Sequence, residues 1–436
     1  MNSIGNGISR RELLKFMGVG AVGTALGSNL AFAQSVPESG TFRFQIESGP
    51  GTDFVAVVDA FIAEHPEITV EFSQVEAAVV GVDWQRIAME AGAVDLISNE
   101  NPKFLKLDPV LKAGLIQPLD GYRDLYEWDD WVLAAALRRS SRGGQLWTLP
   151  LYYEICGASY RKSVLESFDV GEPQSWEEFI AMLEKFKAAG LIPLTNGHRG
   201  FSQIQMIHYQ FWASIGGLSG PGSITDVIFG DGKFTDAPSV EAAQAILDIY
   251  NAGLLDPDVL SITQDDGNER FISGAAALNV TGTWFYSEMQ RQFDDDWDML
   301  TMPGPGGGPI WCTGETEAMV IPAAAQDPDA AALFLDFCVK GTGAKILLER
   351  GNLLATKAFG ELAIPQIQRL PIITGDESSL LIFGWLPQNS QDAYQQGLGG
   401  ILAGSITPQQ WAQQVQDAWE RDIEDGQIPE DRSDLL

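Results

Sequence analysis

Residues 41–72 carry the sequence pattern that most restricts the fold. In 41–46 (TFRFQI) apolar and polar residues alternate, which predicts a strand with one buried face. Apolar residues then recur at helical spacing over 54–62, and the sequence ITVEF at 68–72 predicts a second strand. A strand, a helix and a strand in this order predict a parallel βαβ unit, so we expect an α/β fold.

Two later segments predict how the chain is organised. Residues 146–162 (LWTLPLYYEICGASYRK) are rich in strand-forming residues but contain Pro150. Because proline is rare inside a strand, we expect the chain to cross between two lobes near Pro150. The run MPGPGGGP at 302–309 predicts a flexible connection. Capping residues predict the starts of three helices, at Ser175, Asp327 and Thr407.

The N-terminal residues 1–33 are typical of an export signal. The sequence SRRELLK at 9–15 resembles the twin-arginine motif, and a glycine-rich apolar stretch and Ala-Phe-Ala at 31–33 follow it. We therefore expect a periplasmic protein exported by the twin-arginine route. The apolar stretch is too short and too rich in glycine to span a membrane, and no other apolar run reaches the length of about 18 residues that a membrane-spanning helix needs.

Charge and rare residues exclude several classes of protein. The formal net charge of −32 makes nucleic acid and anionic membranes poor partners, because both need cationic contacts. Only three histidines are present, which argues against a histidine-rich metal site. We expect no metal and no cofactor. Cys156, Cys312 and Cys338 are too scattered for a disulfide framework. We expect buried, unpaired thiols, with one bridge between two of them as the alternative.

The sequence contains no recognisable catalytic motif. Nucleophile elbows, zinc-protease helices and phosphate loops are missing, and no dinucleotide fingerprint G-x-G-x-x-G follows a predicted strand. The acidic run FDDDWD at 293–298 lacks the spacing of a calcium loop, which favours a solvated acidic turn. Paired carboxylates for glycoside hydrolysis stay open, because their separation is a three-dimensional quantity.

Tryptophans are the most informative side chains. The chain has 12 of them, and several lie next to glycines or strand ends: Trp147, Trp284, Trp311 and Trp385. In 271–284 (FISGAAALNVTGTW), Gly274 predicts a left-handed helix end, the following apolar run predicts a buried strand, and Gly282 predicts a turn that places Trp284. Aromatic rings stack on the C–H faces of sugars in preformed sites. For each tryptophan, a place in the core is the alternative.

Three stretches together resemble a known family almost from end to end. They are 146–179 (strand, crossover and Trp-Glu-Glu helix start), 270–284 (RFISGAAALNVTGTW) and 313–356, which begins TGETEAMVIP. They are similar to the sugar-binding proteins of ABC importers, the extracellular solute-binding protein family 1 or maltose-binding-like group. Leu354-Ala355-Thr356 stands where that family usually has proline.

The resemblance implies a type II periplasmic-binding-protein fold. Such a fold has two α/β lobes with mixed sheets flanked by helices, a hinge, and a ligand that drives closure between the lobes. After the signal peptide, the first lobe would comprise 41–149 and 314–366, and the second 150–313 and 367–436.

The resemblance also implies which residues contact the ligand. Asp95 follows a pattern whose residue ends a strand at the cleft, and Trp284 and Trp385 match stacking aromatics. The full predicted set is Glu47, Ser48, Asp95, Asn99, Tyr152, Tyr153, Trp284, Trp311, Glu315 and Trp385.

We therefore expect a non-catalytic, monomeric binding protein. It would bind a monosaccharide, oligosaccharide or sugar alcohol and deliver it to the permease subunits of an ABC importer in the inner membrane. A polyamine or other cationic solute is one alternative, because carboxylates and aromatic rings also suit ammonium groups. A secreted glycan-cleaving enzyme is the other.

Overall fold

The computed structural model describes residues 36–47, 54–75, 84–98, 107–200, 202–357 and 378–428. The predicted signal peptide, residues 1–33, lies outside these ranges. Within them, no helix combines the length and the apolar composition needed to cross a membrane.

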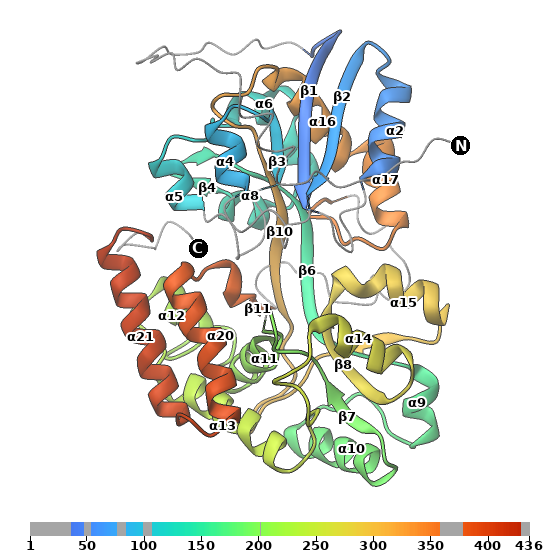
Figure 1. Ribbon diagram of the computed structural model, residues 1–436, viewed down its shortest axis with the longest axis vertical. Coiled ribbons are helices and arrows are strands. Elements are labelled where there is room, and N and C mark those ends of the chain that lie inside the picture. The colour runs from blue at the N-terminus through green and yellow to red at the C-terminus, as the bar shows by residue number, and fades with distance from the viewer. Residues whose placement is uncertain are drawn as a thin grey trace. The chain divides into compact units, whose positions relative to one another are not determined.

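The described residues form two compact units, each with its own strands and helices (Figure 1). Unit 2 comprises the described residues of 154–314 and 378–428, and unit 1 comprises the others. The chain leaves unit 1 inside β6 (Leu149–Tyr160) and returns to it inside β10 (Cys312–Val320). Pro150, near which a crossover was expected, is the second residue of β6, at the end of a strand where proline is tolerated.

Unit 1 is built on the predicted βαβ unit. β1 (Gly40–Glu47) pairs in parallel with β2 (Ile68–Val75), and α2 (Val55–Glu64) lies between them in the sequence. β3 (Leu96–Ser98) pairs in parallel with the other side of β1, and the end of β10 runs antiparallel to β3. The predicted parallel unit is confirmed.

The alternating residues of β1 form the core of unit 1. Phe42 and Phe44 are fully buried, and their rings lie 5.5 and 5.2 Å from that of Phe334 on α16 (Pro328–Val339). Phe61 on α2 completes the cluster, 5.1 Å from Phe334. Burying each ring contributes about 1.5–3 kcal/mol, so this apolar face fixes β1 against both helices.

The remaining elements of unit 1 are short. They are α4 (Trp84–Glu90), α5 (Leu107–Lys112), α6 (Asp120–Leu125), α7 (Trp128–Trp131), α8 (Ala134–Arg139), β4 (Ser141–Arg142), β5 (Gln145–Leu146) and α17 (Gly341–Glu349).

The sheet of unit 2 has β8 (Ala276–Gly282) at its centre. β7 (Ile192–Thr195) pairs in parallel with one side of β8, and β6 runs antiparallel along the other side. β9 (Asp298–Leu300) adds to β6, and β11 (Ser379–Leu380) pairs in parallel with the start of β10. The predicted α/β class, with mixed sheets and flanking helices, is confirmed.

Helices surround this sheet and begin at well-defined caps. The predicted caps at Ser175, Asp327 and Thr407 are all present, and Gln410 completes the capping box at Thr407. The helices of unit 2 are α9 (Lys162–Ser167), α10 (Trp176–Ala188), α11 (Ile204–Gly216), α12 (Ile224–Phe229), α13 (Ala237–Asn251), α14 (Gln264–Ile272), η1 (Thr283–Phe285), α15 (Tyr286–Phe293), η2 (Ile382–Gly384), α20 (Gln388–Leu402) and α21 (Pro408–Glu424).

The glycine-rich run at 302–309 is not the flexible connection that its composition predicts. The backbone N–H of Gly304 donates to Oγ of Ser214 on α11 at 2.8 Å, and that hydroxyl donates to the carbonyl of Gly308 at 2.7 Å. A Cβ at Gly307 would lie 1.9 Å from the carbonyl oxygen of Ser214. The glycines therefore let this segment pack directly on the α11 backbone.

Candidate functional site

The carboxyl ends of parallel strands are where α/β proteins usually bind ligands. In unit 2, β8 ends at Gly282, which pairs with Cys156 of β6, just after the chain has entered this unit. The backbone N–H of Ile155 donates to Oγ1 of Thr283, at 3.3 Å. The segment that carries Trp284 is therefore bonded to the strand that enters unit 2.

Trp284 is half-buried and lies over its own strand end. A Cβ at Gly282 would lie 2.1 Å from the six-membered ring of this indole. The backbone of Gly282 is extended, with φ at −140°, so the turn inferred from this glycine is wrong. Glycine is needed here because the indole packs against the bare backbone. Gly274 does take the predicted left-handed conformation, with φ at 78°.

Trp311 and Trp385 are each connected to β11, one by a backbone hydrogen bond and the other along the chain. The carbonyl of Trp311 accepts a hydrogen bond from the backbone N–H of Ser379 at 2.8 Å, and Trp385 follows β11 by a few residues. Both indoles are half-buried. The Trp385 ring meets Phe229 edge to face, with centroids 4.9 Å apart, which fixes its orientation.

Four buried amide side chains of unit 2 were not predicted from the sequence as ligand contacts. Asn196 directly follows β7 and is 1% exposed, and neither atom of its amide has a hydrogen-bond partner among the described residues. The same holds for Oε1 of Gln203, Nε2 of Gln205 and Oε1 of Gln391. Buried polar atoms are nearly always paired, so each of these amides has hydrogen-bonding capacity that a polar ligand group would satisfy.

Gln205 and Gln391 hold each other in a defined orientation. Oε1 of Gln205, on the first turn of α11, accepts from Nε2 of Gln391 at 3.0 Å and from Nε2 of Gln395 at 3.3 Å, both on α20. This leaves one donor, Nε2 of Gln205, and one acceptor, Oε1 of Gln391, unpaired among the described atoms. A hydroxyl group, which both donates and accepts, is the complement of such a pair.

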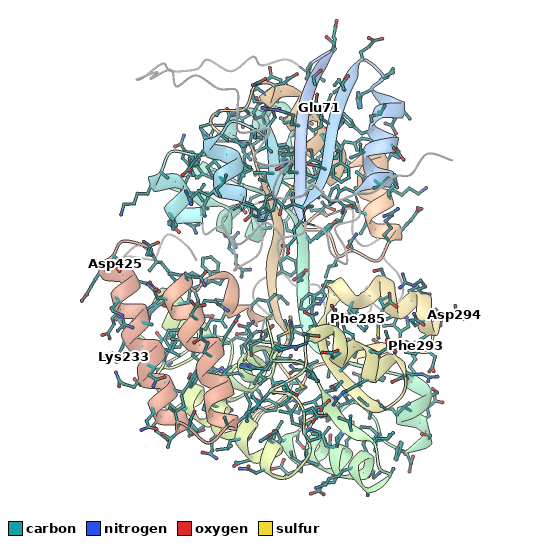
Figure 2. The ribbon with its side chains drawn as sticks, in the orientation of Figure 1. Glu71, Lys233, Phe285, Phe293, Asp294 and Asp425 are labelled. Atoms are coloured by element: carbon teal, nitrogen blue, oxygen red, sulfur yellow. The ribbon has the colours of Figure 1, made fainter. Side chains whose placement is uncertain are left out.

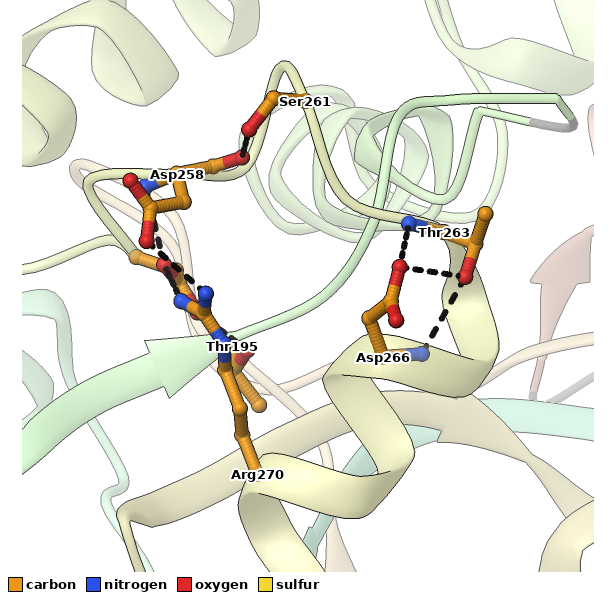
Figure 3. A network of polar contacts seen from close by, with 7 residues as sticks. Thr195, Asp258, Ser261, Thr263, Asp266 and Arg270 are labelled. Atoms are coloured by element: carbon orange, nitrogen blue, oxygen red, sulfur yellow. Dashed lines mark hydrogen bonds and ion pairs between the residues drawn. The ribbon is translucent and has the colours of Figure 1, made fainter.

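An ion-pair network holds the end of β7 (Figure 3). Oγ1 of Thr195 donates to Oδ2 of the fully buried Asp256 at 2.7 Å, and Arg270 on α14 binds both Asp256 and Asp258. Because Thr195 directly precedes Asn196, this network also restricts the position of the unpaired amide.

The carboxyl edge of the unit 1 sheet is also polar. β1 ends at the half-buried Glu47, and Nε2 of Gln85 donates to the carbonyl of Ser98, the last residue of β3, at 2.8 Å. Gln45 on β1 and Trp84 on α4 are buried, and neither Oε1 of Gln45 nor Nε1 of Trp84 has a partner within the described ranges.

Asp95 does not occupy the position expected for it. It precedes β3 rather than ending it, so it lies at the amino edge of the sheet. Its carboxylate receives Nε and Nη2 of Arg43, both at 2.8 Å, and the backbone N–H groups of Arg43 and Gln326. Burial alone would raise the pKa of Asp95, but these hydrogen bonds lower it overall. The carboxylate is already occupied by these groups within unit 1, which favours a structural role.

The other predicted ligand residues are either buried in unit 1 or have side chains outside the described residues. Tyr152 and Tyr153 are buried in unit 1, where they pair with the backbone of Leu354 and Leu353. Glu315 lies on β10, but its side chain is outside the described residues, as are Ser48 and Asn99.

Neither metal nor disulfide chemistry is found in the described ranges. No group of His, Cys, Asp and Glu there could hold a metal ion, and the three cysteines are buried and unbridged, as expected. In the acidic run 293–298, Phe293 ends the helix α15 that follows Phe285, and Asp294 comes next (Figure 2). Asp296 binds Arg161 and Ser163, so this turn is held by an ion pair.

Comparison with known proteins places the chain in a family. Residues 47–340 match the model of the bacterial extracellular solute-binding proteins. A Brucella abortus (strain 2308) protein named as a binding protein is 25% identical over 321 residues, which cover 71% of this chain and 74% of that protein.

Two solved structures share the fold. A chitin oligosaccharide binding protein has a TM-score of 0.74 at 19% identity, over 88% of this chain and 99% of its own. Maltose-bound MalE3 of T. maritima has a TM-score of 0.71 at 18% identity, over 88% of this chain and 100% of its own. The resemblance inferred from the sequence is thus confirmed, and the chain belongs to the bacterial extracellular solute-binding proteins.

Proposed function

We propose that this protein binds a neutral carbohydrate and delivers it to the permease of an ABC importer. One observation carries the proposal: buried amide groups without partners among the described residues lie in a unit that also presents half-buried tryptophans at its strand ends. The proposed ligand contacts in unit 2 are Asn196, Gln203, Gln205, Trp284, Trp311, Trp385 and Gln391.

The hydrogen-bonding pattern favours a polyol over a polyamine. Asn196 and Gln205 each offer an amide N–H₂ that has no acceptor among the described atoms. An ammonium group only donates, so it would leave both donors unpaired at a cost of about 1–3 kcal/mol each. A hydroxyl accepts from these donors and donates to Oε1 of Gln391. The amides therefore suit a hydroxyl-bearing ligand.

The tryptophans supply the apolar part of the site. Indole faces pack on the C–H faces of sugar rings, and rigid, partly exposed indoles do so without losing much conformational freedom. The backbone of Gly282 supports Trp284, and Phe229 supports Trp385. Two solved structures of similar fold are named for a chitin oligosaccharide and for maltose, which supports a saccharide ligand here.

The ligand contacts of unit 1 are less defined. Glu47 ends β1 at the carboxyl edge, beside the buried Gln45. Tyr152, Tyr153 and Glu315 remain predicted contacts, as do Ser48 and Asn99, and enclosure of the ligand by both lobes also remains a prediction. Asp95 is left out, because its carboxylate is bound to Arg43.

We also propose an oligomeric state, an export route and a range of partners for the protein. The family is one of extracellular binding proteins, and we extend this to a monomer without catalytic activity. Export by the twin-arginine route to the periplasm rests on the motif at 9–15 and the Ala-Phe-Ala at 31–33. The net charge of −32 supports the absence of nucleic acid partners.

A thermal-shift panel tests the function. The protein lacking residues 1–33 is screened against neutral mono- and oligosaccharides, sugar alcohols and polyamines. At least one neutral saccharide should raise the melting temperature, because a ligand that binds only the folded state stabilises it. Stabilisation by polyamines alone would overturn the proposal, and so would cleavage of a saccharide shown by chromatography of the incubated mixture.

A further inference from the structure

His208 lies at the centre of the helices of unit 2. It is fully buried on α11, its Nδ1 lies 2.5 Å from the hydroxyl of Tyr394 on α20, and its Nε2 lies 2.9 Å from the carbonyl oxygen of Ser239 on α13. A carbonyl only accepts, so Nε2 carries the proton and Nδ1 accepts from the tyrosine hydroxyl. Burial lowers the pKa of His208 to about 3, so the ring is neutral.

This bond runs beside the amide pair of the proposed site. His208 follows Gln205 on α11 by about one helical turn, and Tyr394 follows Gln391 on α20 by the same distance. Residues three apart on a helix lie on one face, so the two contacts are neighbours between the same two helices. The bond between Gln205 and Gln391 is 3.0 Å long, and the bond between His208 and Tyr394 is 2.5 Å long.

Aromatic rings surround the imidazole and restrict it further. The ring of Trp411 on α21 lies 4.6 Å from it at 70°, and that of Trp212 lies 5.6 Å away at 60°. His208 thus joins four helices, α11, α13, α20 and α21. A histidine whose two nitrogens are both bonded and whose ring is packed has very few alternative orientations.

We propose that His208 is a positioning residue for ligand binding. Its bond to Tyr394 sets α20 against α11, so that Nε2 of Gln205 and Oε1 of Gln391 point at one ligand hydroxyl before the ligand arrives. A donor and acceptor that are already oriented lose less conformational entropy on binding, which raises affinity. This inference rests on the proposed function, since it assigns these two amides to the ligand.

The test removes one atom. Tyr394→Phe keeps the ring contacts to His208 and Trp411 but loses the hydroxyl. With the best saccharide of the panel, calorimetry should show a Kd about tenfold higher than that of the wild type. The matched control is Trp419→Phe, which alters the neighbouring ring contact with Phe234, 5.9 Å away, and leaves His208 untouched. It should lower the melting temperature and keep Kd within about twofold.

A double-mutant cycle separates positioning from general destabilisation. If His208 and Tyr394 act through the amide pair, Tyr394→Phe should change Kd by less than about twofold in a Gln391→Ala background. Full additivity of the two changes would overturn the proposal. His208→Gln is the second variant, because its amide can both donate to Ser239 and accept from Tyr394, and it should keep Kd within about threefold.

The remaining outcomes distinguish a failure of the positioning role from a failure of the proposed function. If the wild type binds a saccharide and Tyr394→Phe binds it equally well, the positioning role is wrong and the proposed function stands. If Tyr394→Phe does not fold, His208→Leu, which can make neither hydrogen bond, takes its place. A Kd about tenfold higher in His208→Leu, with the Kd preserved in His208→Gln, would support the proposal, and equal Kd values in the two variants would contradict it. If the wild type binds no saccharide, both proposals fail together.

Discussion

Gln391 donates a hydrogen bond of 3.0 Å to the amide oxygen of Gln205, which joins the first turns of two helices far apart in the sequence. Each residue is left with one amide atom that has no partner among the described residues, a donor on Gln205 and an acceptor on Gln391. The pair therefore leaves one donor and one acceptor, which together complement a hydroxyl group.

Replacing Trp284 should weaken binding without unfolding the protein. Trp284→Ala removes a half-buried ring, and a loss of about 2 kcal/mol of ligand contact corresponds to a Kd about thirtyfold higher. Calorimetric titration with the best saccharide of the panel measures this. Trp176→Ala is the control, because Trp176 is also half-buried but packs on Phe211. If Trp284→Ala fails to fold, Trp284 belongs to the core.

We expect Gly282 to be required because it leaves space for the Trp284 ring, and not because its backbone conformation is restricted to glycine. Gly282→Ala adds a Cβ 2.1 Å from the indole, so the ring must move. We expect a loss of about 1–3 kcal/mol in the free energy of unfolding and a Kd about tenfold higher. Gly274→Ala is the comparison: its φ of 78° costs about 1 kcal/mol, but no atom lies within 4 Å, so binding should be unchanged. Equal affinities in the two variants would contradict this explanation.

Asp95 should matter for stability and not for binding. Asp95→Asn breaks the ion pair with Arg43 and should lower the free energy of unfolding by about 2 kcal/mol, with Kd unchanged. Denaturant unfolding and titration of the same sample measure both. A loss of affinity at an unchanged free energy of unfolding would show that Asp95 contributes to ligand binding.

The effect of Asp95 should also depend on pH. Because its pKa is lower in the folded protein, its stabilisation is present above the unfolded pKa of about 4 and is lost as the pH falls through the folded value. The difference in stability between the wild type and Asp95→Asn should therefore narrow below about pH 4. A constant difference down to pH 2 would mean that the carboxylate is not the stabilising species.

The features that could be predicted from the sequence are those determined by residues close together in the chain. The alternation in 41–46 and the capping residues Ser175, Asp327 and Thr407 act over a few positions, and the structure has each of them in place. The family could be inferred because several such local patterns occur in the right order.

The errors concern features set by distant parts of the chain. A glycine in a sequence is equally compatible with a turn, a flexible linker or a close contact. Only the positions of Trp284 and Ser214 show why Gly282 and Gly307 are glycine. The amides on α11 and α20 meet only after folding. One signal was available: Gln205, His208 and Gln210 interrupt an otherwise apolar helix, in which every residue from Ile204 to Ser214 is buried. Buried polar residues on a helix need partners from elsewhere.

The salt dependence of binding tests the central claim most directly. Calorimetric titration of the protein lacking residues 1–33 with the best ligand of the panel is performed at about 0.1 M and about 1 M NaCl, where the Debye length falls from about 10 to about 3 Å. A neutral carbohydrate held by amides and indoles should bind with a Kd that changes by less than about twofold. A Kd that rises tenfold or more at high salt would show that charge holds the ligand, and would contradict recognition of a neutral carbohydrate.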